Sequence, residues 1–273
     1  MFRADLHCHT SKSDGSLTPS KLLTLAKEIG LSGICITDHD TIDAYAEAIP
    51  VAKELGLILG AGVEFSCSLN GLSIHVLGYD FDLNSPAVIS LCSKHHTRRI
   101  ERLRRILERL NRLSFTILEE ELQQFSTQSI GRPHIAQLMV TKGYVKSIRE
   151  AFLRYLGDGM PCYEPGETVT VADTLDIIHQ ANGKAFIAHP HLIKQTIPIK
   201  ELLKLPFDGI ECYYAKFSQG QERKWVKIAK ERGLLISGGS DFHGDAKDFI
   251  PLGCSWVDEE TFHKIFQKPL ISQ

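Results

Sequence analysis

Several features are missing from this sequence, and each absence excludes a class of protein. No apolar run approaches the roughly 18 residues that a membrane-spanning helix needs, so we expect no membrane association. Residues 1–12 carry Asp5, His7 and His9 where a secretion signal would need an apolar stretch, which favours a cytoplasmic location. The seven cysteines are scattered without a C-x-x-C pair, as is typical of free thiols in a reducing compartment.

The chain also has no overall basic charge, since its net charge is -2 with neutral histidines. A nucleic-acid partner would therefore need a local basic patch. With 273 residues and 43% hydrophobic content, the chain can form one large α/β domain or a domain with an insertion. No obligate protein partner is evident.

Short apolar runs alternate with helical patterns over most of the chain, which indicates an α/β fold with a parallel sheet or barrel. Asn70-Gly71 is a hairpin signal between two of these runs. The expected strands are Ala4–Leu6, Gly33–Thr37, Leu57–Leu59, Gly62–Phe65, Ile74–Val76, Lys184–Ala188, Gly209–Cys212 and Leu234–Ser237. The expected helices between them are Thr18–Ile29, Thr41–Leu55, Val171–Gln180 and Gln221–Glu231.

Residues 86–160 depart from this alternation and read as consecutive helices. We interpret them as a helical insertion in a body formed by residues 1–85 and 161–273. The stretch 94–112 contains eight Lys or Arg and two Glu, a local charge of +6 (8 − 2), with arginines three or four positions apart. This stripe is either a solvated helix face or a guide for a polyanionic substrate.

Side chains that bind metals recur at or after the carboxyl ends of the expected strands. Such ends meet on one face of a parallel α/β fold, so these residues are expected to form one cluster. A single His-x-His pattern is weak evidence for a metal site, but ligand-type residues at six successive strand ends predict one. Imidazole and carboxylate ligands without thiolates suit Mn²⁺, Fe²⁺ or Zn²⁺ better than Ca²⁺. The candidates are His7, His9, Asp14, His39, Glu64, His75, His189, Asp241 and His243.

Six motifs, in order along nearly the whole chain, resemble those of the PHP family, the polymerase and histidinol phosphatase superfamily of metal-dependent phosphoesterases. Within it, the chain is most similar to stand-alone enzymes of the 3',5'-nucleoside bisphosphate phosphatase or RNase AM type. The motifs span residues 2–15, 36–41, 62–64, 131–134, 188–190 and 239–243.

The resemblance implies a distorted (β/α)7 barrel with a trinuclear metal site, covered by the helical insertion 86–160. It adds His134 to the ligands. One ion would be held by His7, His9, Glu64 and Asp241, a second by Glu64, His75 and His134, and a third by Asp14, His39, His189 and His243. Two or three ions per chain are thus expected, with Mn²⁺ preferred and Fe²⁺ or Zn²⁺ as alternatives.

Such a centre suggests hydrolysis of a phosphate ester. Two ions roughly 3.5–4 Å apart can share a hydroxide and direct it at phosphorus. Glu64 would set the ion spacing and Asp241 would steer the proton of the hydroxide. Arg132 is a candidate phosphate ligand, with a surface salt bridge as the alternative, and His191 either contacts substrate or only bonds its own loop.

The resemblance implies that the substrates are 3',5'-bisphosphonucleotides, short 5'-phosphorylated oligoribonucleotides degraded from 5' to 3', or both. One alternative is a histidinol-phosphate phosphatase of the same superfamily. A second alternative, from another class, is a non-catalytic PHP module that binds metal or only stabilises a larger assembly. Histidinol phosphate assayed against a bisphosphonucleotide separates the first alternative, and a barrel that binds no metal would favour the second.

Overall fold

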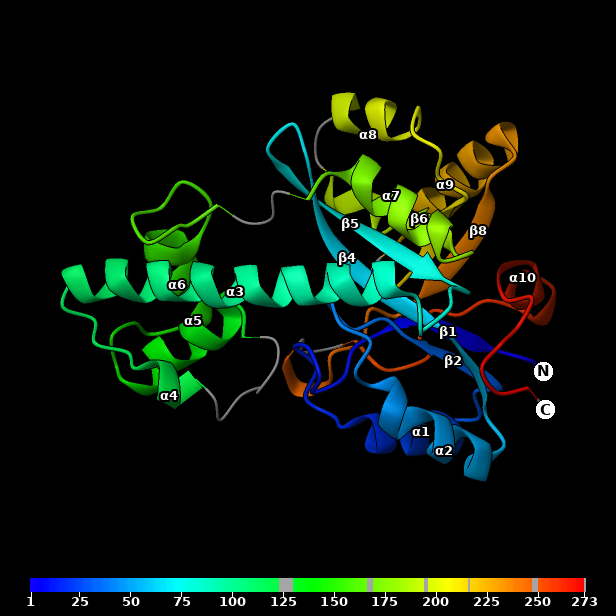
Figure 1. Cartoon of the computed structure of the whole chain (residues 1–273), viewed down its shortest axis with the longest axis horizontal. Helices are drawn as coiled ribbons and strands as arrows, with labels where there is room; N and C mark the ends of the chain where they lie inside the picture. Colours follow the sequence, from blue (N-terminus) through cyan, green and yellow to red (C-terminus); the bar gives the residue numbers. More distant parts are fainter. Residues whose placement is uncertain (123–129, 166–168, 194–195, 216, 247–249, 273) are drawn as a thin grey trace. The chain divides into compact units, whose positions relative to one another are not determined.

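A computed structural model describes residues 1–122, 130–165, 169–193, 196–215, 217–246 and 250–272 (Figure 1). The chain divides into two compact units. Unit 1 comprises Met1–Cys92 and Thr168–Gln273, and unit 2 comprises Ser93–Glu167. The division falls inside the long helix α3 (Pro86–Arg112).

Unit 1 contains every strand that the structure describes, arranged in two sheets. The strands are β1 (Ala4–Cys8), β2 (Gly33–Ile36), β3 (Ile58–Gly60), β4 (Gly62–Leu69), β5 (Leu72–Tyr79), β6 (Lys184–Ile187), β7 (Gly209–Tyr214) and β8 (Leu235–Gly239). The helices of this unit, besides the start of α3, are α1 (Pro19–Glu28), α2 (Tyr45–Leu55), α7 (Val171–Gln180), η2 (Pro190–Leu192), α8 (Thr196–Leu202), α9 (Gln219–Arg232), η3 (Gly244–Ala246) and α10 (Glu259–Ile265).

The first sheet is parallel, in the order β1-β2-β3. The second has the order β4-β5-β6-β7-β8, with antiparallel β4-β5 and β5-β6 pairs and parallel β6-β7 and β7-β8 pairs. Isolated bridges from Cys8 to Phe242 and from His39 to Glu64 connect the two sheets just beyond the ends of β1 and β2. The fold is therefore mixed α/β, with the exits of two parallel strands beside the second sheet.

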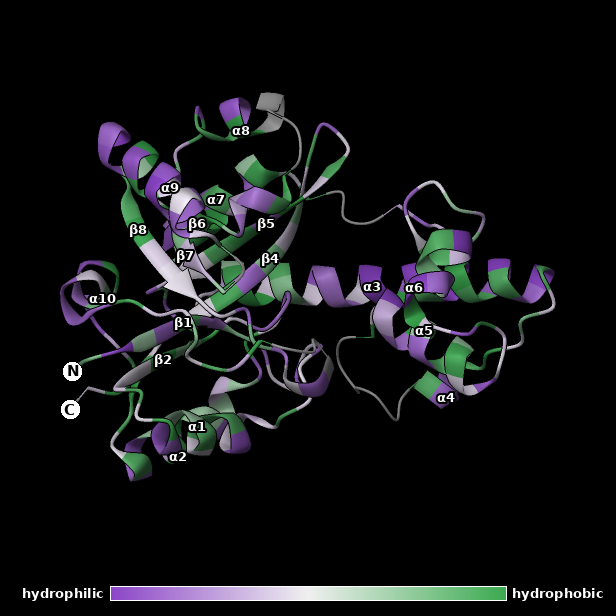
Figure 2. Ribbon diagram, turned by 180° about the vertical axis from the view of Figure 1, so that it is seen from behind, coloured by the Kyte–Doolittle hydropathy of each residue, from purple (hydrophilic) through white to green (hydrophobic). Residues whose placement is uncertain are grey.

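Three apolar cores define the layers of unit 1. One lies between the first sheet and α1 and α2 and includes Leu22, Ile34 and Ala48. Another packs α7 and α9 on the second sheet, and the third joins residues of both sheets to α10. In Figure 2, α9 is largely hydrophilic with interspersed hydrophobic residues, as expected for a helix that buries Trp225 and Ala229 and exposes its other side.

Unit 2 is helical in its described part and has its own core, which includes Leu103, Leu110 and Met139. Besides most of α3 it contains α4 (Glu119–Leu122), α5 (Arg132–Thr141), α6 (Ile148–Ala151) and a π-helical turn, η1 (Phe152–Leu156). Among the helices that the structure describes in either unit, none combines the length and the apolar character needed to cross a membrane.

The basic stripe of α3 is engaged within unit 2. Glu164 accepts from Arg105 at 2.9 Å and from Arg109 at 2.6 Å, and its carbonyl accepts from Arg102 at 3.0 Å. Arg109 also donates to the carbonyl of Tyr163 at 2.7 Å. One side of α3 therefore anchors the segment that leads out of the unit, so these three arginines have a structural role.

Three local expectations need correction. The helix expected from Thr41 begins at Tyr45, and Pro50 lies within it without ending it. His7 lies inside β1 and not after it, because β1 continues to Cys8. Glu64 was expected at the end of its strand, but β4 runs on to Leu69 since the hairpin at Asn70-Gly71 pairs it with β5 over its full length.

Candidate metal centre

The contact between β1 and β8 brings the first and last motifs together. Gly239 makes this approach possible, because a β-carbon there would lie 2.3 Å from the backbone nitrogen of His7. Beyond it, the backbone nitrogen of Asp241 donates to the carbonyl of His7 at 2.7 Å, and that of His9 to the carbonyl of Phe242 at 2.9 Å. Residues more than 230 positions apart thereby form one wall of a site.

Eight of the ten predicted ligands fall into three overlapping groups. Within each group, one nitrogen or oxygen atom per residue lies within 4.8 Å of all the others. Because His9, His39 and Glu64 each belong to two groups, the three groups form one continuous centre. The groups are His7, His9, Glu64 and Asp241; His9, Asp14, His39 and His243; and His39, Glu64 and His75.

Glu64 is the centre of the cluster. Its Oε2 lies 3.2 Å from His9 Nε2, 3.2 Å from His39 Nδ1 and 3.3 Å from His7 Nε2. Its Oε1 lies 2.8 Å from both His75 Nδ1 and His189 Nε2. The carboxylate thus faces two sets of imidazoles, which is the position of a ligand shared between two ions.

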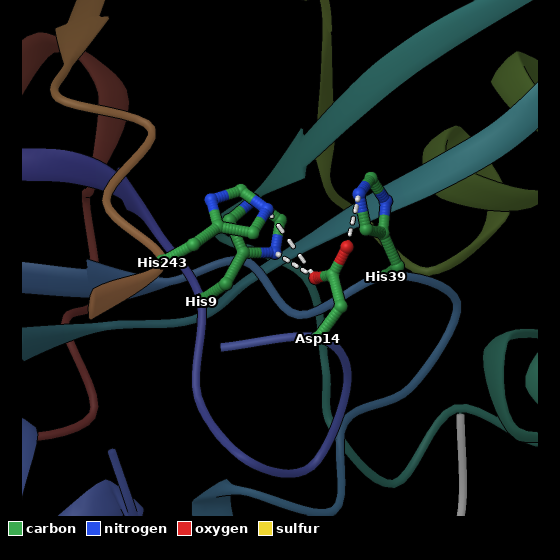
Figure 3. A group of neighbouring side chains, drawn as sticks. All are labelled: His9, Asp14, His39 and His243. Atoms are coloured by element: carbon green, nitrogen blue, oxygen red, sulfur yellow. Dashed lines mark ion pairs between the residues drawn. The ribbon is translucent and has the colours of Figure 1, made fainter. Parts of the chain in front are cut away.

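Asp14 is the carboxylate of a second group, shown in Figure 3. Its Oδ1 lies 3.3 Å from His243 Nε2 and 3.7 Å from His9 Nδ1, and its Oδ2 lies 3.8 Å from His39 Nε2. In this group, His9 occupies the place that the resemblance implies for His189. His189 contacts Glu64, and none of the three groups, drawn from the described residues, contains it beside Asp14.

The donor set fits bound cations. His9 Nε2 and His39 Nδ1 are buried and make no hydrogen bond, although carboxylate oxygens lie 3.2 Å away. A buried polar atom without a hydrogen bond is costly, so its presence suggests a missing partner. These two nitrogen atoms, grouped with carboxylate oxygens, form a donor set suited to a divalent ion of the Mn²⁺, Fe²⁺ or Zn²⁺ type.

The protonation states of the centre are coupled to this arrangement. Burial opposes ionisation of Glu64, yet the neighbouring His39, His75 and His7 hold the pKa of its carboxyl well below its usual range. Burial lowers the pKa of His39 to about 3. Burial also acts to lower the pKa of His9, but its contacts with Asp241 and Glu64 raise it to about 9. A cation that binds here therefore meets an ionised carboxylate and releases a proton from His9.

Three residues of the site have strained backbones. Asp241, Asp40 and His189 have positive φ angles of 55°, 57° and 25°. A non-glycine residue rarely adopts this conformation, and such strain occurs most often where a side chain must be aimed for function. The positive φ of His189 turns the chain just after β6, so that the imidazole points back at Glu64.

Two supporting residues on β7 were not predicted. Glu211 is fully buried, and its Oε1 lies 2.7 Å from His7 Nδ1 while its Oε2 accepts from the backbone nitrogen of His189 at 2.6 Å. The hydroxyl of Tyr214 donates to Asp241 Oδ2 at 2.8 Å. Such outer partners fix the orientation of metal ligands. The available sequence signal was a glutamate inside an apolar strand, Gly209–Tyr214.

The aspartates beside His39 hold the surrounding loops. Asp38 accepts from the backbone nitrogen and hydroxyl of Thr10 at 2.7 and 2.6 Å, and from the hydroxyl of Ser13 at 2.6 Å. Asp40 accepts from the backbone nitrogen and hydroxyl of Ser66 at 2.7 and 2.9 Å. Asp38 therefore fixes the loop that carries Asp14, and Asp40 fixes the loop after β2 against β4.

The remaining predicted ligand, His134, lies in unit 2 together with Arg132. On α5, His134 Nδ1 accepts from the backbone nitrogen of Gly131 at 3.0 Å. Arg132 forms a salt bridge with Asp158 at 2.8 Å and donates to the carbonyl of Leu156 at 3.1 Å. The ion pair that was the alternative interpretation of Arg132 is thus present, while a phosphate-binding role for it stays a prediction.

His191, the other predicted substrate residue, lies in unit 1 on η2. Its ring centroid is 4.6 Å from that of Tyr214, 4.7 Å from that of Phe217 and 6.5 Å from that of His189. It is therefore next to the metal centre, connected to Asp241 through the ring of Tyr214.

Comparison with known proteins agrees with this geometry. The PHP domain model matches residues 5–161, more than half of the chain. The chain is 32% identical over 259 residues to a 5'-3' exoribonuclease of Haemophilus influenzae, covering 93% of this chain and 92% of the relative. It is 31% identical over 250 residues to a 3',5'-nucleoside bisphosphate phosphatase of Chromobacterium violaceum, with 89% and 88% covered.

Solved structures show the same fold. A protein of Bifidobacterium adolescentis described as a metal-dependent phosphoesterase superposes with a TM-score of 0.85 at 29% identity, covering 96% of this chain and 94% of that one. An amidohydrolase of Chromobacterium violaceum with bound sulfate and no metal superposes with a TM-score of 0.82 at 29% identity, with 94% and 92% covered. Given the matching family model and the ligand cluster, this chain belongs to the PHP domain family.

Proposed function

We propose that this chain hydrolyses phosphate esters of nucleotides, namely 3',5'-bisphosphonucleotides, short 5'-phosphorylated oligoribonucleotides cleaved from 5' to 3', or both. The chain is a metal-dependent phosphoric ester hydrolase of the PHP family. The observation that carries the proposal is the three-group cluster around Glu64, which resembles a multinuclear phosphoesterase centre. The names of the relatives favour nucleotides over histidinol phosphate as the substrate class.

The proposal assigns two or three divalent ions, Mn²⁺ first, to the ten predicted ligands. His134 is included with the nine in unit 1, and the segment 86–160 is proposed to cover the site of a distorted (β/α)7 barrel. When bound, such ions activate water and neutralise charge on phosphoryl oxygens. The ligands proposed are His7, His9, Asp14, His39, Glu64, His75, His134, His189, Asp241 and His243.

The chain's own residues have distinct proposed roles. Glu64, central to two donor groups, holds the ligand set at a fixed spacing. Asp241 directs Oδ1 toward His9 at 3.3 Å and keeps Oδ2 bonded to Tyr214, so one oxygen faces the centre while the other holds its orientation. In this orientation, Asp241 can accept a proton from the attacking water. Arg132 and His191 are proposed to bind substrate phosphate or sugar.

The test offers the Mn²⁺-loaded protein 3',5'-bisphosphoadenosine, a 5'-phosphorylated RNA trimer and histidinol phosphate. We expect inorganic phosphate from the bisphosphonucleotide and stepwise mononucleotides from the trimer. Asp241→Asn and a chelated sample should lower both rates by at least about a hundredfold. Turnover of histidinol phosphate alone would contradict the nucleotide assignment, and tight metal binding without turnover of any substrate would support a non-catalytic module.

A further inference from the structure

A cavity in unit 1 lies between α8 and α9, whose residues supply most of its lining. Its volume is about 520 Å³, which is within the usual range for ligand pockets. Its apolar lining residues include Ile199, Leu203 and the buried Trp225. A space of this kind suits the flat, apolar part of a ligand.

The charged residues of this pocket are mostly basic. Lys200, Lys224 and Arg232 line it with a single acid, Glu231, which gives +2 (3 − 1) on a chain whose net charge is -2. Lys200 and Lys224 are exposed at its rim. The Arg232 guanidinium donates to the carbonyl of Leu203 at 3.0 Å, so it is partly engaged in the wall. An anionic ligand is therefore favoured over a neutral one.

Two residues that line the pocket neighbour the candidate metal centre. They are Pro190 and His191, which directly follow the candidate ligand His189. The ring of His191 also packs on Tyr214, whose hydroxyl binds Asp241. His191 thus lies between the candidate metal centre and the basic pocket.

We infer that the pocket between α8 and α9 is a subsite for the nucleotides of an oligoribonucleotide that lie beyond the cleaved bond. This inference rests on the proposed nucleotide phosphoesterase function. Bases and riboses pack on the apolar lining residues, while Lys200 and Lys224 pair with backbone phosphates. A bisphosphonucleotide has no nucleotide beyond its scissile phosphate, so it fills the metal centre and leaves this pocket free.

The test compares two double variants of equal charge change. Lys200→Glu on α8 with Lys224→Glu on α9 alters the pocket, whereas Lys227→Glu with Lys230→Glu alters exposed lysines of α9 that do not line it. We measure kcat/KM for a 5'-phosphorylated RNA trimer and for 3',5'-bisphosphoadenosine, at low and at physiological salt. The pocket variant should lose roughly tenfold on the trimer, more at low salt, and keep its rate on the bisphosphonucleotide.

Two results would overturn the subsite: an equal loss of kcat/KM on both substrates, or the same loss on the trimer in the control variant. Either result would mean that the added negative charge acts on the whole molecule and not through the pocket. Binding of a fluorescent RNA trimer to chelated protein, followed by anisotropy, provides a readout without turnover. Should the parent enzyme hydrolyse neither substrate, the proposed function fails. The subsite is then judged by anisotropy alone, where weaker binding only in the pocket variant supports it and equal binding contradicts it.

Discussion

At the scale of single residues, the carboxylate of Glu211 sets the tautomer of His7, one of the proposed metal ligands. Its Oε1 lies 2.7 Å from His7 Nδ1, so that nitrogen carries the proton and Nε2 is left to face Glu64 and Asp241. The other oxygen accepts from the backbone of His189. One buried side chain thus sets the orientation of His7 and the strained turn at His189.

Glu211→Gln is expected to weaken Mn²⁺ binding by about 10–100-fold, the usual effect of losing such a partner. The amide cannot serve both contacts. If the glutamine oxygen accepts from His7, the glutamine NH₂ faces the backbone N–H of His189, and two donors meet. If the amide is turned round, its NH₂ donates to His7 Nδ1 and moves the His7 proton to Nε2. Calorimetric Mn²⁺ titration measures the change. Saturating Mn²⁺ should restore part of the activity, as expected for a positioning residue.

Glu222→Gln, on the outer helix α9, serves as the matched control and should bind Mn²⁺ like the parent. An unchanged Mn²⁺ affinity in Glu211→Gln, with the metal-free protein still folded by circular dichroism, would show that His7 needs no outer partner.

The residue-scale features that sequence reasoning identified were ligand types, because histidines and carboxylates beside apolar runs are visible in one dimension. Glu211 and Tyr214 were missed because their contacts, with His7 and Asp241, join positions far apart in the chain. The proximity of His9 to Asp14 likewise depends on contacts between loops that the sequence does not reveal. Which imidazole reaches which carboxylate depends on the unusual φ of His189, and the sequence alone does not specify that angle.

At the scale of elements, two side chains accept hydrogen bonds from the backbone N–H groups at the start of α1. One belongs to the residue just before the helix and the other to α2. Thr18 accepts from the backbone nitrogen of Lys21 at 3.3 Å, and Glu47 of α2 accepts from the backbone nitrogen of Ser20 at 3.0 Å and from its hydroxyl at 2.6 Å. A carboxylate at a helix amino terminus also meets a favourable dipole. Hydrogen bonds from Ser20 hold the pKa of Glu47 below its usual value.

Glu47→Gln should therefore lower the free energy of unfolding by about 0.5–1 kcal/mol at pH 7. Since the folded pKa is below the unfolded one, this contribution is complete above the unfolded pKa of roughly 4.3 and disappears as pH falls through the folded pKa. Urea unfolding of parent and variant at pH 7, 5 and 3 measures the difference. Glu54→Gln, an exposed position on the same helix, is the control. A difference that persists unchanged at pH 3 would contradict this role.

The elements themselves were largely predictable, because caps, turn residues and apolar periodicity are local. The hairpin at Asn70-Gly71 and the helix from Val171 to Gln180 match the structure. The antiparallel pairing of β5 with β6 was not predicted, since strand order depends on contacts between distant segments. The hairpin pairing of β4 with β5 carries β4 past Glu64 and so places this proposed central ligand within a strand.

At the scale of the whole molecule, metal binding and folding are linked within unit 1, which contains nine of the ten proposed ligands. An ion that binds only the folded state stabilises it by about 2.7 kcal/mol at a hundred times its Kd. Both tryptophans, Trp225 and Trp256, belong to this unit, so tryptophan fluorescence follows its unfolding alone. Far-UV circular dichroism follows both units together.

Mn²⁺ should raise the fluorescence midpoint by several degrees, in proportion to the logarithm of its concentration, and chelation should reverse the rise. Glu64→Gln with Asp241→Asn should abolish the shift, because it removes the shared carboxylate and a second ligand of one donor group. If His134 is also a ligand, Mn²⁺ must stabilise unit 2 as well, and His134→Ala should reduce the dichroism shift more than the fluorescence shift. If Mn²⁺ binds but leaves the fluorescence midpoint unchanged, the ion lies outside the cluster around Glu64.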